Sequence, residues 1–139
     1  INGKRVITHL SKGQNPVAAS RVFDYVQSEP GNKAVILIID DCDDAKNSSE
    51  NLTWLYDADF ELLNKDDIKQ IIIGGVRAND YYLRLLYAGV PEEKIIKTIN
   101  EFETTKFIEK DVDTIFILHD IYKYDVALKL KDNIRGGKI

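Results

Sequence analysis

Residues 34–39 read AVILII, and this unbroken apolar run limits the folds open to the chain. In an extended strand, successive side chains point to opposite faces, so both faces of this strand are hydrophobic. Helices must then cover it on both sides, as they cover the central strands of a parallel sheet. The run therefore predicts an α/β fold.

Other strand-like segments alternate with helical patterns along the chain. The strand segments are residues 5–10, 70–73, 95–99 and 114–118. Short connections between alternating strands and helices favour right-handed crossovers and a mainly parallel sheet. We therefore expect residues 1–139 to form a single three-layer, Rossmann-like α/β domain with five or six strands.

Helix boundaries are marked most clearly after the first and third strands. Asn15 can accept a hydrogen bond from the free amides of a helix that has Pro16 in its first turn. Gly89 can adopt a left-handed conformation past the helix that follows the third strand, and Pro91 prevents its continuation. Further helices are expected near residues 51–56, 100–109 and 120–134.

Composition excludes several classes of function. The chain has 19 Lys and Arg against 23 Asp and Glu, and neither sign forms a long run that could neutralise phosphates, so a nucleic-acid partner is not expected. No apolar stretch reaches the roughly 20 residues of a membrane span. One cysteine and two histidines give no ligand set for zinc, so no metal site is expected. The chain lacks methionine and begins with Ile1, and we interpret it as a piece of a longer cytoplasmic protein.

Two segments at the ends of strands were considered as ligand sites. Residues 40–44 (DDCDD) follow the apolar run, but matching magnesium or phospho-acceptor partners are missing after later strands, so a solvated loop is favoured. Gly74, Gly75 and Arg77 could offer backbone amides to an anion, although a tight turn also explains both glycines. No Walker or dinucleotide-binding motif is present.

Residues 54–61 (WLYDADFE) concentrate aromatic and acidic side chains. The rings could simply pack a short helix while the carboxylates face water. Three acids this close together repel one another unless one has a cationic partner, and the sequence offers no obvious one. Cys42 would need His9 or His119 beside it to form a nucleophile and base pair, which scattered positions do not supply. The residues alone thus predict a soluble α/β domain with an acidic, aromatic site.

Three segments resemble the carboxy-terminal domain of Mur ligase relatives of the MurT type. Residues 10–16 contain an Asn-Pro loop, residues 49–61 resemble the aromatic and acidic signature of that domain, and residues 74–91 resemble its arginine-bearing turn, helix and glycine stop. With the strands between them, the resemblance covers nearly the whole chain. Residues 43–49 depart from the family pattern because they lack its glycine and basic arginine, and the Asn-Pro segment lacks the glycine and Asn-Glu pair that should follow it.

The resemblance implies a role in modifying a peptidoglycan precursor. A protein of this family amidates the D-glutamate of the lipid II stem peptide, using ATP and ammonia from a GatD-like glutaminase subunit. ATP and Mg²⁺ would be bound mainly by a preceding domain that this chain lacks, so the isolated domain would hold no cofactor and would be inactive. The reaction would take place in the cytoplasm, at the inner face of the membrane.

The resemblance also assigns roles to the residues of the acidic segment. An aspartate of this domain completes a Cys-His-Asp triad with the glutaminase, and that role falls first on Asp57 and second on Asp59. Trp54, Tyr56 and Glu61 would form the interface with the partner.

Residues near the substrate or nucleotide come from two other segments. Lys12 and Asn15 belong to the Asn-Pro loop, and Gly74, Gly75 and Arg77 follow the third strand. Asn15 has a structural use as a helix cap that could account for it alone.

Two other functions fit the same features. The chain could be a non-catalytic docking domain that binds a partner through residues 54–61. It could also be the last domain of a Mur or folylpolyglutamate-type ligase, which joins an amino acid to its acceptor and needs no glutaminase.

Overall fold

A computed structural model describes residues 3–11, 15–39 and 52–137 of the chain. Within these ranges the chain forms a five-stranded sheet in the order β1-β5-β2-β3-β4, and every pair of neighbours is parallel. The strands are β1 (Arg5–Leu10), β2 (Lys33–Ile38), β3 (Ile68–Gly74), β4 (Ile95–Thr98) and β5 (Thr114–His119). The predicted α/β fold with a parallel sheet is confirmed.

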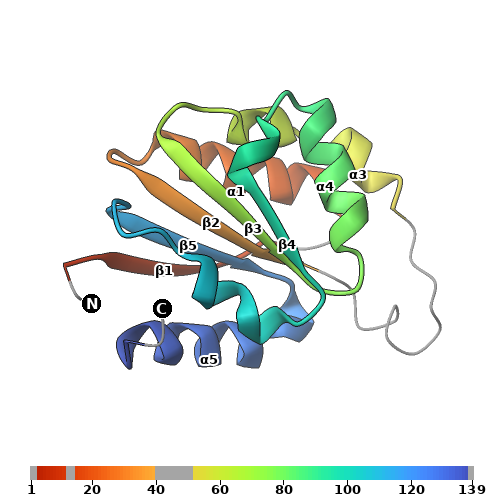
Figure 1. Ribbon diagram of the computed structural model, residues 1–139. Coiled ribbons are helices and arrows are strands. Elements are labelled where there is room, and N and C mark those ends of the chain that lie inside the picture. Colours follow the sequence, from red (N-terminus) through yellow and green to blue (C-terminus); the bar gives the residue numbers. More distant parts are fainter. Residues whose placement is uncertain (1–2, 12–14, 40–51, 138–139) are drawn as a thin grey trace.

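Helices cover both faces of the sheet (Figure 1). On one face lie α1 (Pro16–Ser28), α3 (Trp54–Asp57), α4 (Ala78–Tyr87) and the 3₁₀ helix η1 (Phe60–Leu63), and on the other lie η3 (Glu101–Phe107) and α5 (Tyr124–Arg135). Two further short 3₁₀ turns are η2 (Glu92–Lys94) and η4 (Ile121–Lys123). No helix in the described ranges is both long and apolar enough to cross a membrane.

The apolar run of β2 occupies the position that its composition predicts. All of its side chains are buried, and they alternate between two hydrophobic cores. Val35 and Leu37 pack into the core beneath α1 and α4, whereas Ala34, Ile36 and Ile38 pack into the core beneath α5. Each face of the strand is thus covered by a separate helical layer.

The predicted helix boundaries around α1 and α4 are confirmed. The Asn15 side chain accepts a hydrogen bond from the Ala18 amide at 3.0 Å, and Pro16 occupies the first turn of α1. Gly89 has a φ of 86°, which is the left-handed conformation that glycine adopts without strain. The Val90 amide then donates to the carbonyl of Leu85, which closes the end of α4.

The segment expected to form a helix over residues 100–109 is a shorter 3₁₀ helix, η3. Its start is as expected, because Asn100 accepts a hydrogen bond from the Phe102 amide. Its end is set by the buried side chain of Gln70 on β3, which donates to the Phe107 carbonyl at 2.9 Å and accepts from the Glu109 amide at 2.7 Å. These two bonds hold the chain in a non-helical path beyond Phe107.

The last helix begins later than residue 120. Asp120 accepts a hydrogen bond from the Tyr122 amide, and its carbonyl accepts one from Lys123, so the chain first makes the short turn η4. The helix α5 then runs from Tyr124 to Arg135. The helix expected near residues 51–56 is the single turn α3, and residue 51 lies outside the described ranges.

Gly74 offers a test of how tightly η3 packs on the sheet. A Cβ atom at this position would lie 2.8 Å from Thr104 Cγ2 and 3.0 Å from Glu101 Cα, which is backbone and cannot rotate away. Replacing Gly74 with Ala should therefore lower the free energy of unfolding by about 1–3 kcal/mol. Urea denaturation of the 139-residue chain measures this change.

Gly136→Ala is the matched control, since a Cβ there would come no closer than 3.5 Å to another atom and φ is −75°. It should leave the denaturation midpoint nearly unchanged. Equal midpoints for the two variants would contradict the close packing of η3 on Gly74.

Candidate functional site

Two exposed carboxylates flank a buried alanine in the loop that follows α3. Ala58 lies between Asp57 and Asp59 in an extended conformation (φ −87°, ψ 145°), and its side chain is buried. Asp57 is the last residue of α3, and Asp59 (φ −83°, ψ 63°) directly precedes η1, so the two carboxylates leave the chain on either side of the buried Ala58. Both aspartates are exposed.

The two carboxylates line an open groove of about 610 Å³ against the first half of α1. Its lining consists of Pro16, Val17, Ser20, Arg21, Asp24, Asp57, Asp59 and Leu62. In the part of the chain that the structure describes, Asp57 and Asp59 form no ion pair, and neither does Arg21. The groove therefore presents two carboxylates that are free to interact with a group from another molecule.

Three backbone hydrogen bonds fix the path of this loop. The Ala58 amide donates to the Trp54 carbonyl at 3.1 Å, and the Asp59 amide donates to Ser20 Oγ at 2.9 Å. From the opposite side, Arg84 Nη2 donates to the Ala58 carbonyl at 2.9 Å. The loop is thus bound to α1 on one side and to α4 on the other.

Arg84 is the cation that the sequence did not reveal. Its side chain is buried, and its Nη2 donates to both carboxylate oxygens of Glu61, at 2.8 and 3.0 Å. Arg84 is thus the partner within the chain that was not obvious from the sequence, and it pairs with Glu61. The two residues are 23 positions apart in the sequence, and only the packing of α4 beside η1 brings them together.

The pKa of the Glu61 carboxyl is lowered from its ordinary value. Partial burial acts to raise this pKa, but a hydrogen bond from the backbone amide of Glu61 and the hydrogen bond and charge of Arg84 together outweigh it. Glu61 thus stays ionised to lower pH than a free glutamate. Asp57 and Asp59 are therefore the acids of this segment that remain without an internal partner in the described ranges.

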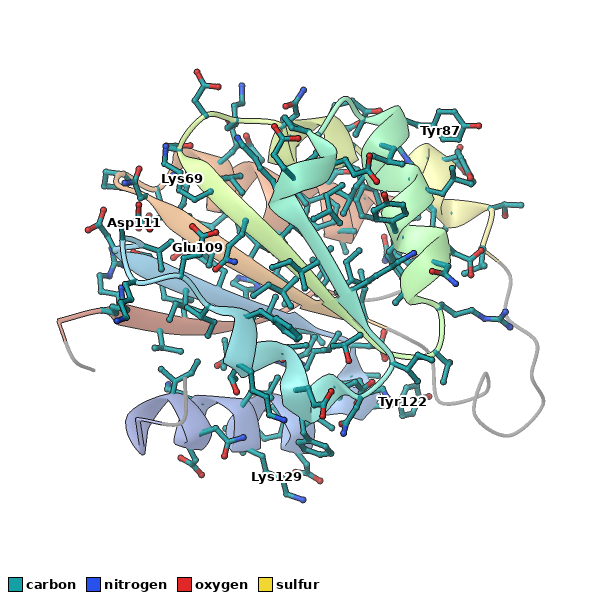
Figure 2. The ribbon with its side chains drawn as sticks, viewed as in Figure 1. Lys69, Tyr87, Glu109, Asp111, Tyr122 and Lys129 are labelled. Carbon is teal, nitrogen blue, oxygen red and sulfur yellow. The ribbon has the colours of Figure 1, made fainter. Side chains whose placement is uncertain are left out.

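The aromatic residues of the segment divide between core and surface. Trp54 is only 5% exposed and packs against the rings of Phe60 and Tyr81. Tyr56 is 58% exposed, and its ring lies 6.4 Å from that of Tyr87, which projects from the end of α4 (Figure 2). Of the three residues expected to face a partner, Tyr56 and Glu61 reach the surface, and Trp54 supports them from the core.

The glycine turn after β3 has structural uses for both glycines. Gly74 is packed against η3, and the Gly75 amide donates to the Thr98 carbonyl at 3.0 Å, so this amide is already occupied. Gly75 has a φ of 127°, a value that favours glycine. Arg77 is half-buried at the cap position of α4.

Of the remaining candidates, the Asn-Pro segment lies near the aspartates, and the others lie outside the described residues. Asn15 caps α1, and the adjacent Pro16 lines the groove, so the Asn-Pro segment and the two aspartates are neighbours. Lys12 and the acidic residues 40–44 lie outside the described residues. In the described ranges, no group of three or more His, Cys, Asp or Glu could hold a metal ion.

Comparison with known proteins identifies the family. A family model described as "MurT ligase C-terminal" matches residues 12–133, which include both aspartates and Arg84. The chain belongs to the MurT ligase C-terminal family. Its parallel α/β sheet flanked by helices agrees with the Rossmann-like fold that the resemblance to Mur ligase C-terminal domains predicts.

Curated MurT proteins are similar to nearly the whole chain. A protein of Streptococcus pneumoniae (strain ATCC BAA-255 / R6) is 34% identical over 129 residues, which cover 91% of this chain and 27% of the relative. One of Staphylococcus aureus (strain COL) is 35% identical over 136 residues, which cover 97% of this chain and 30% of the relative. Both are named lipid II isoglutaminyl synthase (glutamine-hydrolyzing) subunit MurT. The chain thus spans less than a third of the length of these MurT relatives.

The lowered pKa of Glu61 predicts a pH-dependent contribution to stability. Glu61→Gln removes the carboxylate from Arg84, so the variant should unfold at lower urea than the parent at pH 7. A carboxyl whose pKa is lower in the folded than in the unfolded state stabilises the fold above its unfolded-state pKa, which is about 4.3 for glutamate. This stabilisation is lost as the pH falls through the folded-state pKa. The difference in urea midpoint between parent and variant should therefore be smaller at about pH 3 than at pH 7.

Glu103→Gln is the control, because Glu103 pairs with Lys106 across an exposed turn. Exposed pairs contribute little, so this variant should match the parent at both pH values. A Glu61→Gln deficit that is as large at low pH as at neutral pH would contradict the role of the ionised carboxylate.

Proposed function

We propose that this chain is the C-terminal domain of an ATP-dependent amidotransferase that modifies a peptidoglycan precursor with ammonia from a glutaminase partner. The observation that supports this most directly is the pair of exposed carboxylates, Asp57 and Asp59, which line an open groove and form no ion pair among the described residues. The names of the MurT relatives, a glutamine-hydrolysing lipid II isoglutaminyl synthase subunit, agree with it.

In this proposal Asp57 acts on a histidine of the partner glutaminase. Its carboxylate accepts a hydrogen bond from the imidazole, holds that ring in one tautomer and stabilises its protonated form. The imidazole takes the proton of the partner's cysteine thiol, and the thiolate attacks the side-chain amide carbon of glutamine. The protonated imidazole gives this proton to the departing nitrogen, so the C–N bond breaks, ammonia leaves and a thioester remains, which water then hydrolyses to glutamate and the free thiol. Asp59, which lines the same groove, is the second candidate for this role.

The ligation step would use groups that lie mainly outside this chain. ATP and Mg²⁺ would be bound by a preceding domain, where the acceptor carboxylate of D-glutamate becomes an acyl phosphate. Ammonia then displaces phosphate to give the amide. Pro16 at the start of α1 lines the aspartate groove, and Asn15 directly precedes it, which supports a position of this segment close to the acceptor. The proposal places the reaction in the cytoplasm, at the inner face of the membrane.

A non-catalytic docking role is the competing function, and the exposed Tyr56 and Tyr87 rings favour it. Tyrosine is enriched among the residues that contribute most to protein interfaces. A docking domain would need these rings but not an ionised Asp57, so charge removal at Asp57 separates the two functions.

Replacing Asp57 with Asn in the full complex tests the proposed role. The amide keeps the shape of the side chain but cannot hold the imidazole in the same tautomer, so glutamine hydrolysis and glutamine-dependent amidation should fall by about 10²–10⁴-fold. Amidation with added ammonium chloride should be unchanged, because it bypasses the glutaminase. Mass spectrometry of the lipid II product and an assay of released glutamate give both rates.

Asp59→Asn, made in parallel, is the matched variant. It should retain glutamine-dependent activity if Asp57 is the triad residue, and the reverse result would transfer the role to Asp59. Full glutamine-dependent activity in both single variants and in the double variant would overturn the proposed function and favour docking.

A further inference from the structure

Arg84 holds the backbone on both sides of Asp57 and the side chain of Glu61 beyond Asp59. Its Nε donates to the Leu55 carbonyl at 2.6 Å, and its Nη2 donates to the Ala58 carbonyl at 2.9 Å. The same Nη2 binds the Glu61 carboxylate. The acceptors of this one side chain therefore enclose the stretch that carries Asp57 and Asp59.

The loop depends on outside anchors because its own secondary structure is minimal. The helix α3 has four residues, and a helix that short is not stable by itself. The carbonyls at its end also lack partners within the helix, and a cation is favourable there. Arg84 supplies both the hydrogen bonds and the charge from α4, a separate element.

The contacts require an arginine rather than any cation. A guanidinium presents several N–H groups in a rigid planar fork, whereas a lysine has a single ammonium on a flexible stem. The Arg84 guanidinium also lies 5.9 Å from the ring centroid of Tyr56 and 5.3 Å from that of Phe60. The guanidinium thus lies over two aromatic rings while its N–H groups bind oxygen atoms.

We propose that Arg84 is the positioning residue of the glutaminase reaction. It fixes the loop so that the Asp57 carboxylate projects into the groove in the direction that the partner's imidazole requires, without itself touching a substrate. The proposal rests on the function proposed above. A misplacement of about 1 Å in a catalytic group can cost about 10²-fold in rate, so loop geometry alone can control the reaction.

Arg84→Lys in the full complex is the principal test. The variant keeps the positive charge but cannot reproduce the fork, so kcat for glutamine hydrolysis should fall by about 10-fold or more, while KM for glutamine should stay the same. Ammonium-dependent amidation should be unchanged. A variant that acted only by unfolding the domain would lose both activities together.

Lys33→Met is the matched control for lost stability. Lys33 is also a fully buried cation, and it binds the carbonyls of Glu29 and Gly31 and the carboxylate of Asp67. It lies at the start of β2, and neither Lys33 nor any of these three partners lines the aspartate groove. Its loss should destabilise the domain without selectively lowering glutamine hydrolysis.

Hydrogen exchange separates this proposal from the proposed function. In the full complex, Arg84→Lys should speed amide exchange in the peptide that covers residues 55–61, and Lys33→Met should not. Unchanged exchange in that peptide, or equal loss of both activities, would overturn the positioning role. Full glutamine-dependent activity of Arg84→Lys would also overturn it if Asp57→Asn is inactive. If Asp57→Asn is fully active, the proposed function fails and the exchange result alone judges whether Arg84 fixes the loop.

Discussion

Strands β2 and β5 carry side chains that are buried on both faces, and the rest of the fold follows from the need to cover them. Complete burial of a single Ile or Leu contributes about 1.5–3 kcal/mol, so an uncovered face would be costly. Helices on both sides meet this need, and parallel connections bring the carboxyl ends of all strands to one edge. Polar chemistry is then confined to loops around the two helical layers.

Buried cations organise those loops in the same way at two places. Arg84 and Lys33 each combine backbone carbonyls with one carboxylate that is partly exposed. A buried charge is tolerated when it is paired and hydrogen-bonded, and the loop that supplies the oxygen atoms is then fixed to the core. One of these two buried cations, Arg84, holds the loop that carries Asp57 and Asp59. The stability of the domain and the geometry of its candidate site therefore depend on the same contacts.

Local features of the fold could be predicted from sequence, whereas non-local ones could not. The Asn15 cap, the glycine stop at Gly89 and the doubly buried strand depend on residues adjacent in the chain, and all were predicted. Strand order and the Arg84–Glu61 pair depend on contacts between distant segments, for which a single sequence holds no signal. The buried position of Trp54 could not be predicted for a related reason. A tryptophan beside carboxylates has the same local sequence pattern whether it faces a partner or the core.

The inward side chain of Ala58 also makes the acidic loop sensitive to length. Ala58 lies between the end of α3 and the start of η1, and its burial and the hydrogen bond from Arg84 to its carbonyl hold it in place. Inserting or deleting one residue beside Ala58 would shift at least one of the two aspartates relative to this anchor. The two aspartates flank one buried anchor but leave the chain from different backbone conformations, so each carboxylate would approach a partner from its own direction.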